Sequence, residues 1–320
     1  MKISAIHACA PPLTVTNADL SSLVDTSDEW IVSRTGISER HISTGENTSE
    51  SAVRVAQGLL EKSGISAEEI GLIIVATVSA DYRTPSAACM VQAGIGAVNA
   101  FAFDINAACA GFVYALSIAS RFVGAYKNVM VIASECLSKL VDWTDRGTCV
   151  LFGDGAGGVI LSENGGEFIL AETLHSDPNG VFAIKGGYSP VENAWVNNSE
   201  QHGTYLEMDG REVFNFAAKR VPQSIREVLA AANTDISAVK YFVTHQANYR
   251  ITEAVAKKLS QPLTKFYTNI ERYGNTSSAS IPLALCDMER EGLITLGSGE
   301  LLVLSGFGAG LTWGSILIKI

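Results

Sequence analysis

The chain has few charged residues, little proline and no long hydrophobic run, and each shortage excludes a class of protein. Charged residues make up 18% of the 320 residues and hydrophobic residues 47%, so we expect much of the chain to be buried. Eight prolines against 29 glycines disfavour a disordered chain and suit tight turns. No stretch has membrane-spanning length, and the apolar run in MKISAIHACAPP is too short for a secretory signal. The sequence therefore predicts a cytoplasmic globular protein.

The six cysteines form no CxxC pair and show no metal-ligand spacing. Without a secretory signal we expect reduced thiols, most of them small buried residues, and no metal site. The net charge of −10 disfavours nonspecific binding to nucleic acid. An acidic partner would need a local basic patch.

Continuous apolar runs alternate with helical patterns along the whole chain. Residues 70–79, 129–133 and 301–305 predict buried strands. A capping box in TSDE, residues 26–29, predicts a short helix that ends at Gly36. Strands separated by helices indicate an α/β protein with a parallel or mixed sheet.

A weak internal repeat indicates a duplicated fold. Residues 53–79 and 221–247 both have the pattern helix, turn, strand with the same spacing, and each half later has a glycine-rich turn next to an apolar strand (GDGAGGVIL and GFGAGLTWGSILI). We therefore divide the chain into halves of residues 1–165 and 166–320, with the seam in SENGGE. Residues 177–203, rich in Asn, Gly and Ser, are expected to form a surface excursion.

Cys109 lies among small residues in NAACAGFVYAL, and a helical apolar pattern follows it. This places the thiol near a helix N-terminus, where unpaired N–H groups and the helix dipole favour the thiolate. Taken alone, the pattern does not separate a nucleophile from a buried structural cysteine. The structural interpretation is the one we apply to the other five cysteines.

His245 and Asn275 are two further candidates, each with a plainer structural interpretation. His245 follows the predicted strand 241–244, at the carboxyl end where α/β proteins build sites. Asn275 lies in a glycine turn that leads into a helix, where a helix cap is the plainer explanation. Neither residue identifies a function alone.

Together, Cys109, His245 and Asn275 fit two kinds of enzyme. Papain-like proteases have Cys, His and Asn in this order, but their cysteine lies near the mature N-terminus in a CGxCW-like setting. A decarboxylating condensing enzyme needs a thiolate to hold an acyl group and two neutral donors to stabilise an enolate. A neutral histidine and an asparagine amide supply such donors, and the α/β pattern around Cys109 favours this second kind.

Seven long motifs occur in order along the chain: DEWIVSRTGISERHI, NAACAGFVYAL, VDWTDRG, LFGDGAGG, HQANYRI, YGNTSSASIP and LSGFGAGLTWG. In these motifs the chain resembles, nearly end to end, the β-ketoacyl-[acyl-carrier-protein] synthase III family of the thiolase superfamily. The resemblance implies a five-layered αβαβα fold from two similar halves and a homodimer. It also implies the decarboxylative condensation of an acyl-CoA with malonyl carrier protein that initiates fatty-acid synthesis, without a metal or redox cofactor.

The resemblance also implies roles for individual residues. Cys109 corresponds to the acyl-accepting nucleophile, and His245 and Asn275 correspond to the decarboxylation pair. The backbone N–H groups of Cys109 and Ala309 would form the oxyanion hole, although the family commonly has glycine at the second position. The residues implied for binding CoA are Trp30, Arg34, Thr35, Arg146, Gly210, Phe214, Ala247, Asn248 and Arg250.

Two expectations concern the substrates' surroundings. Arg250, Lys257 and Lys258 share one face of the helix after HQAN, which is either a merely solvated basic face or a docking patch for an acidic carrier protein. Thr84 occupies the position where acetyl-preferring members of the family carry phenylalanine, which closes the partner's acyl pocket. The smaller threonine predicts a deeper pocket and longer or branched primers.

Two alternatives to the condensing enzyme remain. One is a related acyltransferase of secondary metabolism, against which the complete pair of His245 and Asn275 argues. The other is an inactive partner subunit, against which the intact Cys109 argues.

Overall fold

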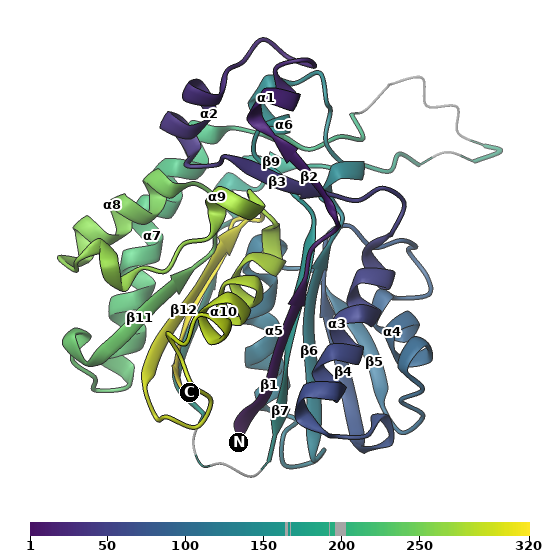
Figure 1. The fold of residues 1–320 in the computed structure, drawn as a ribbon, viewed down its shortest axis with the longest axis vertical. Helices are drawn as coiled ribbons and strands as arrows, with labels where there is room; N and C mark the ends of the chain where they lie inside the picture. Colours follow the sequence, from purple (N-terminus) through teal and green to yellow (C-terminus); the bar gives the residue numbers. More distant parts are fainter. Residues whose placement is uncertain (164–165, 167, 192, 196–202) are drawn as a thin grey trace.

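The computed structural model describes the whole chain except residues 164–165, 167, 192 and 196–202 (Figure 1). The first sheet contains β1 (Lys2–Cys9), β4 (Ile70–Ala76), β5 (Phe101–Ile105), β6 (Asn128–Glu135) and β7 (Gly155–Ser162). The second contains β8 (Ile169–Ser176), β11 (Val239–Thr244), β12 (Leu301–Gly308) and β13 (Thr312–Lys319). Their strand orders are β1-β7-β6-β4-β5 and β11-β12-β13-β8.

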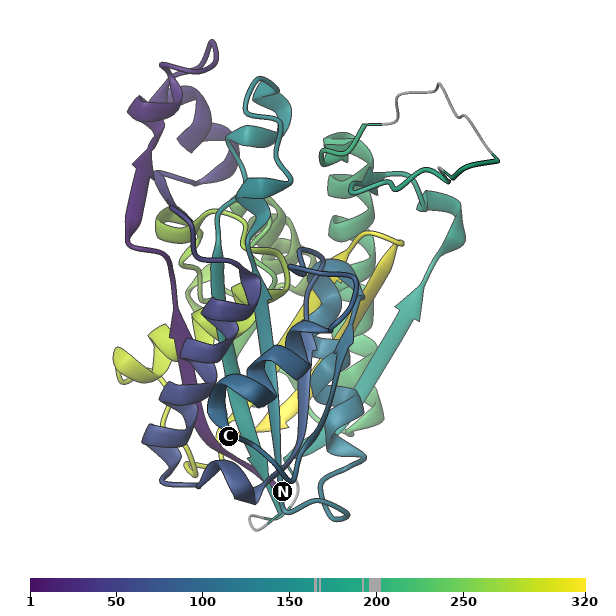
Figure 2. The same ribbon diagram turned by 90° about the vertical axis from the view of Figure 1, so that its right-hand side faces the viewer.

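Six helices and the two sheets form five layers. The helices are α3 (Thr48–Ser63), α4 (Ala87–Ile95), α5 (Gly111–Ser120), α7 (Gly210–Ala231), α8 (Tyr249–Leu259) and α10 (Ser280–Arg290). The helices α3 and α4 pack on the outer face of the first sheet, and α7 with α8 packs on that of the second; α5 and α10 lie between the sheets and contact both (Figure 2). Because helices cover both faces, every residue of β6 and β7 is buried. The predicted αβαβα fold is confirmed.

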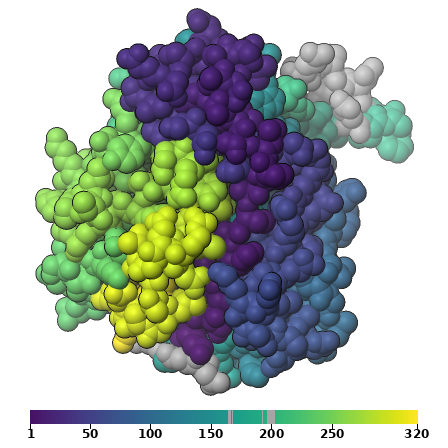
Figure 3. Space-filling model, in the orientation of Figure 1, coloured from purple at the N-terminus to yellow at the C-terminus, as the bar shows by residue number. Residues whose placement is uncertain are grey.

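The two halves repeat one another in structure. The unit of α3, a 3₁₀ turn at Ala67–Glu69 and β4 returns as α7, a 3₁₀ turn at Ile236–Ala238 and β11. The strands β7 and β13 each run antiparallel beside a long buried neighbour, β6 or β12. On the surface the first half (purple to blue) and the second half (green to yellow) lie side by side (Figure 3). Much of the predicted seam lies outside the described residues, so the division at 165/166 stays a prediction.

The halves differ at one edge. In the first sheet, β5 is a full edge strand that pairs in parallel with β4. In the described part of the second sheet, the equivalent position holds only an isolated bridge between Phe242 and Phe266, whose rings stack with centroids 4.8 Å apart. No strand among the described residues of the second half therefore corresponds to β5.

Predicted strand and helix ends agree with the structure to within a few residues. Ser27 caps α2 (Asp28–Thr35) by accepting a hydrogen bond from the Trp30 N–H, and Gly36 ends it at φ +79°. The strand β4 stops at Ala76, three residues before the predicted end. There the chain turns, and the hydroxyls of Thr77 and Ser79 donate to the buried Glu135 carboxylate.

A small cap covers the upper end of both sheets in Figure 1. It consists of β2 (Leu13–Thr16), α1 (Asn17–Leu20), α2, β3 (Glu39–Ile42) and α6 (Arg146–Cys149). The fully buried guanidinium of Arg40 donates to the Asn17 side chain and to the Val150 carbonyl, each at 2.9 Å. Arg40 thereby ties the cap to the loop after α6.

Most described residues of the predicted surface excursion, residues 177–203, are exposed, although Gly180 and Ala183 are buried. Its strand β9 (Ile184–Lys185) pairs with β10 (Glu207–Met208), which follows the segment. Residues 192 and 196–202 of this segment lie outside the described residues. Within the described part of the chain, no helix is long and apolar enough to span a membrane.

Candidate active site

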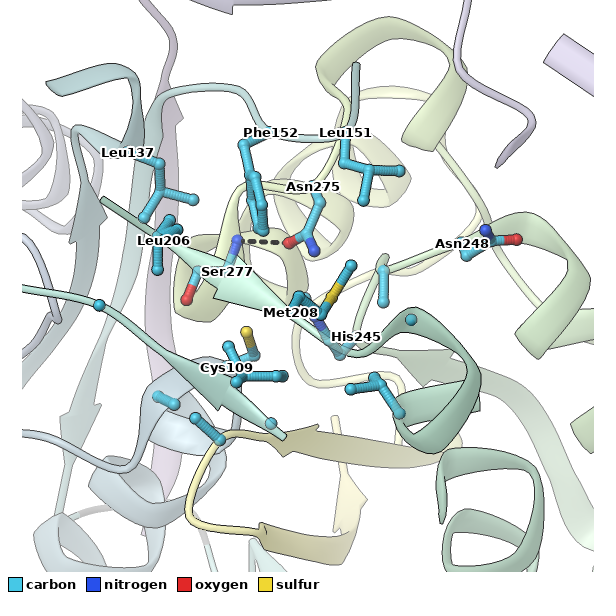
Figure 4. A pocket seen from close by; sticks show the side chains of 18 of the residues that line it. Cys109, Leu137, Leu151, Phe152, Leu206, Met208, His245, Asn248, Asn275 and Ser277 are labelled. Atoms are coloured by element: carbon cyan, nitrogen blue, oxygen red, sulfur yellow. Dashed lines mark hydrogen bonds between the residues drawn. The ribbon is translucent and has the colours of Figure 1, made fainter. Parts of the chain in front are cut away.

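A cavity of about 710 Å³ opens beside the start of α5, and residues from both halves line it. Cys109, His245 and Asn275 all reach it, from three separate segments of the chain (Figure 4). The structure thus brings together the three residues that the sequence selected. They lie 136 and 30 positions apart along the chain, so only the packing of one half on the other makes them neighbours.

Cys109 lies in the 3₁₀ turn Ala108–Ala110, directly before α5. The turn packs so closely on β12 that a Cβ on Gly308 would lie 2.7 Å from the Cys109 nitrogen. Burial raises the pKa of the thiol to about 12, although the Ser277 hydroxyl and the residue's own N–H favour the thiolate. The predicted position before a helix is confirmed, but burial opposes the thiolate that this position was expected to favour.

His245 follows β11 directly, as predicted, and its backbone N–H donates to the Ser305 carbonyl at 2.8 Å. Its ring packs edge-on against Phe307 with centroids 5.0 Å apart, and Nδ1 lies 2.7 Å from the Ser280 hydroxyl. Burial lowers the pKa of the imidazole to about 3. The ring is therefore uncharged at neutral pH.

Asn275 lies between α9 (Ile270–Tyr273) and the 3₁₀ turn Ser277–Ala279. Its backbone N–H donates to the Leu151 carbonyl at 2.8 Å, and its side-chain Oδ1 accepts from the Ser277 N–H at 2.9 Å (Figure 4). Because Oδ1 faces the Ser277 N–H, the amide presents its donor group, Nδ2, on its other side (Figure 4). The cap position of the 3₁₀ turn belongs to Thr276, so the capping interpretation of Asn275 is wrong, but the bond from the Ser277 N–H orients the Asn275 amide.

Most of the residues implied for CoA binding surround the mouth of the cavity. Its lining includes Arg34, Gly210, Phe214, Ala247, Asn248 and Arg250. Trp30 lies outside the lining, and the guanidinium carbons of Arg34 and Arg146 lie 4.8 and 5.0 Å from its ring centroid. Thr35 is not brought to the cavity: it is buried, and its hydroxyl bonds the Ile31 carbonyl and the Ile37 N–H.

The residues predicted for the oxyanion hole, the acyl pocket and the docking patch lie in three different surroundings. Ala309 lines the cavity, and the left-handed φ of its turn falls on Gly310 at +126°, so alanine fits the backbone there. Thr84 is exposed and does not line its own chain's cavity. Arg250, Lys257 and Lys258 are exposed on α8, and Arg250 reaches the cavity mouth.

Sequence reasoning missed the residues that hold the predicted three in place. Ser277 and Ser280 lie within YGNTSSASIP, but three serines and a threonine in ten residues gave no means to rank them. Glu135 ends a buried strand, and its carboxylate accepts from the Ser278 hydroxyl at 2.7 Å. The signal that could have identified Glu135 is its position as an acidic residue at the end of an apolar run.

The chain matches the family described as 3-oxoacyl-[acyl-carrier-protein (ACP)] synthase III over residues 103–178, and the C-terminal part of that family over residues 229–320. A β-ketoacyl-[acyl-carrier-protein] synthase III of Streptococcus thermophilus is 50% identical over 321 residues, covering 100% of this chain and 99% of the relative. One from Clostridium tetani is 49% identical, covering 97% and 95%.

Solved structures agree with the sequence relatives. The crystal structure of 3-oxoacyl-[acyl-carrier-protein] synthase III from Aquifex aeolicus superposes with a TM-score of 0.92 at 42% identity, covering 100% of this chain and 99% of that one. Fold and sequence therefore agree along the full length, and the chain belongs to the β-ketoacyl-[acyl-carrier-protein] synthase III family.

Proposed function

We propose that this chain joins an acyl-CoA primer to malonyl carrier protein and so starts fatty-acid synthesis in the cytoplasm. The observation that supports the proposal most directly is one cavity that holds a half-buried thiol, an uncharged histidine and an oriented asparagine amide. These groups match the needs of acyl transfer followed by decarboxylation. The proposed reaction has two substrates and uses no metal or redox cofactor.

In the first half-reaction the Cys109 sulfur gives up its proton and attacks the acyl carbon of the acyl-CoA. The N–H groups of Cys109 and Ala309 stabilise the negative charge on the carbonyl oxygen. The bond between the acyl carbon and the CoA sulfur then breaks. CoA leaves as a free thiol with the proton, and the acyl group stays on Cys109.

In the second half-reaction the malonyl group loses carbon dioxide. The electron pair of the broken C–C bond forms an enolate, and N–H groups of His245 and Asn275 donate to its oxygen. The enolate carbon attacks the acyl carbon, the C–S bond to Cys109 breaks, and the sulfur takes up a proton from solvent. Because loss of carbon dioxide itself forms the enolate, no proton is removed from the malonyl group, and His245 and Asn275 act only as hydrogen-bond donors.

The pairing of Trp30 with two arginines supports a nucleotide site at the cavity mouth. An indole and guanidinium groups stack on an adenine, and arginines bind phosphates in a forked geometry. The helix α2 that carries Trp30 packs on α8 so closely that a Cβ on Gly36 would lie 2.6 Å from the Tyr249 Cβ. For Thr35 we propose only a structural role, since its hydroxyl bonds the Ile31 carbonyl and the Ile37 N–H at the C-terminal end of α2.

The exposed edge of β5 supports a homodimer. Phe101 at its start is exposed, and its ring lies 5.7 Å from Phe122 and 5.1 Å from Tyr126. An edge strand with aromatic side chains beside it is a surface that pairs readily with another strand. We propose that a second copy of the chain covers this edge.

Carbon dioxide release from malonyl carrier protein in the presence of acetyl-CoA tests the proposed function. A condensing enzyme releases carbon dioxide and forms a β-ketoacyl carrier protein. An acyltransferase acting on oxygen or nitrogen acylates Cys109 without this release, and an inactive partner subunit does neither.

Reversal of charge at Lys257 should weaken docking of the carrier protein. Arg250, Lys257 and Lys258 give a basic face to a chain with a net charge of −10, and carrier proteins of this pathway are acidic. We expect Lys257→Glu to raise the KM for malonyl carrier protein and to reduce its salt dependence, with acylation by acetyl-CoA unchanged.

Steady-state kinetics at several salt concentrations measure this effect. Lys127→Glu is the matched control, because Lys127 is exposed and lies just before β6, at the end opposite the cavity. Equal effects of Lys257→Glu on both half-reactions would show that the face is only solvated.

The size of Thr84 should set the length of the primer. Since Thr84 does not line its own cavity, we propose that it acts on the acyl pocket of a partner. Each further methylene buried in a deeper pocket contributes about 0.8 kcal/mol, or about fourfold in binding. We expect butyryl-, branched or longer acyl-CoAs to acylate Cys109 at least as well as acetyl-CoA.

A competition of acetyl-, isobutyryl-, hexanoyl- and octanoyl-CoA, read by intact mass, measures this preference. Thr84→Phe should shift it towards acetyl-CoA. A wild-type preference for acetyl-CoA, or unchanged selectivity in Thr84→Phe, would refute the role of Thr84.

A further inference from the structure

An uncharged imidazole carries a single N–H, so His245 donates into the cavity only if the proton is on the correct nitrogen. The proposed role of His245 requires a donor at the nitrogen that faces the substrate. The inference that follows rests on that proposed role. It concerns what selects the protonated nitrogen.

The Ser280 hydroxyl is the hydrogen-bond partner of the ring. Its oxygen lies 2.7 Å from the His245 Nδ1 and 2.9 Å from the Ser277 carbonyl oxygen, and it accepts from the Gln246 N–H at 3.3 Å. A hydroxyl has one hydrogen to donate. It therefore donates either to Nδ1 or to the Ser277 carbonyl, and the choice decides the tautomer of the ring.

The Ser277 carbonyl and His245 Nδ1 differ in whether another donor is available, and this difference decides which of them the Ser280 hydroxyl donates to. The Ser277 carbonyl already accepts the backbone N–H of Ser280. For His245 Nδ1, the Ser280 hydroxyl is the one partner among the residues that the structure describes. Both Ser280 and His245 are 2% exposed, so solvent does not readily replace the hydroxyl. A buried acceptor without a donor is costly, which favours donation to Nδ1.

We propose that Ser280 fixes His245 in the tautomer with its proton on Nε2, by donating its hydroxyl to Nδ1. Nε2, on the other side of the ring, then presents an N–H to the cavity. In the opposite tautomer Nε2 would present a lone pair, which repels the enolate oxygen. Ser280 is thus a positioning residue for the decarboxylation step and touches no substrate itself.

Nitrogen NMR of the full-length wild type, labelled with ¹⁵N-histidine, tests the proposal directly. The shifts of the two ring nitrogens at pH 7 separate a protonated from an unprotonated nitrogen, and the spectrum of a His245→Gln variant assigns the signals. We expect the proton on Nε2. A proton on Nδ1 would overturn the proposal, whether or not any Ser280 variant folds.

Variants of Ser280 give a kinetic test. Ser280→Ala should slow carbon dioxide release from malonyl carrier protein by about ten- to a hundredfold and affect acylation by acetyl-CoA much less, whereas Ser280→Thr keeps a hydroxyl and should retain most of the rate. Ser162→Ala is the matched control: it removes a buried hydroxyl that bonds Asn128 and Ser4 at the far end of β7, and we expect both rates to persist.

The outcomes separate this inference from the proposed function. If the wild type releases no carbon dioxide from malonyl carrier protein, the proposed function fails. If it does release carbon dioxide but Ser280→Ala slows both half-reactions equally, or changes neither, the role of Ser280 fails alone.

Discussion

Replacement of Cys109 by alanine should abolish the acyl-enzyme, because the proposed mechanism has no other acyl acceptor. Intact-mass measurement after incubation with acetyl-CoA should show one added acetyl group on the wild type and none on Cys109→Ala. The loss should be complete, since the covalent intermediate cannot form without the sulfur.

The matched control is Cys89→Ala. Cys89 is exposed on α4, where an unrelated thiol would react adventitiously, and its removal should leave acetylation in place. Acetylation of Cys109→Ala that maps to another residue would contradict the assignment of the nucleophile.

Alanine at His245 or Asn275 should separate the two half-reactions. Each variant should still form the acyl-enzyme, because neither side chain forms the bond to the acyl group. Carbon dioxide release should fall by about a hundred- to a thousandfold, the usual cost of one lost oxyanion donor. Intact mass measures the first half-reaction, and carbon dioxide release with malonyl carrier protein measures the second.

The pH dependence of carbon dioxide release tests whether His245 is uncharged. Burial lowers the pKa of the ring from 6.5 to about 3, so the uncharged form should persist as the pH falls through 6.5. Carbon dioxide release by pre-acylated enzyme should therefore show no inflection near pH 6.5 from His245.

The outcome that would contradict the assigned roles is a loss of acylation in both His245→Ala and Asn275→Ala.

The fold was predictable because its signals are local and repeated. Buried strands such as β6 and β12 are continuous apolar runs, and glycines such as Gly36 mark helix ends where φ is positive. The lengths were less accurate. The strand β4 ends at Ala76 because polar side chains of Thr77 and Ser79 turn towards Glu135, a contact between distant segments that no local pattern contains.

The reactive residues of the site could be predicted from the sequence, whereas their protonation states could not. Cys109, His245 and Asn275 were identified by motif and by strand or helix ends. The pKa values of Cys109 and His245 depend on burial, which the sequence does not give: the same helix start that favours a thiolate lies in surroundings that raise the thiol pKa to about 12. Ser280 was hidden for a similar reason, since its importance comes from a 2.7 Å contact across 35 residues.

If the protein forms the proposed dimer through β5, the unequal edges of the two halves decide how far this contact extends. If β5 pairs with β5 of a second copy about a twofold axis, the same edge is used in both copies and none is left over. Among the described residues of the second half, the equivalent position holds only the isolated bridge at Phe266 and no full strand. Association through β5 alone would then close at two subunits, whereas a matching open strand in the second half would let subunits add head to tail into a filament.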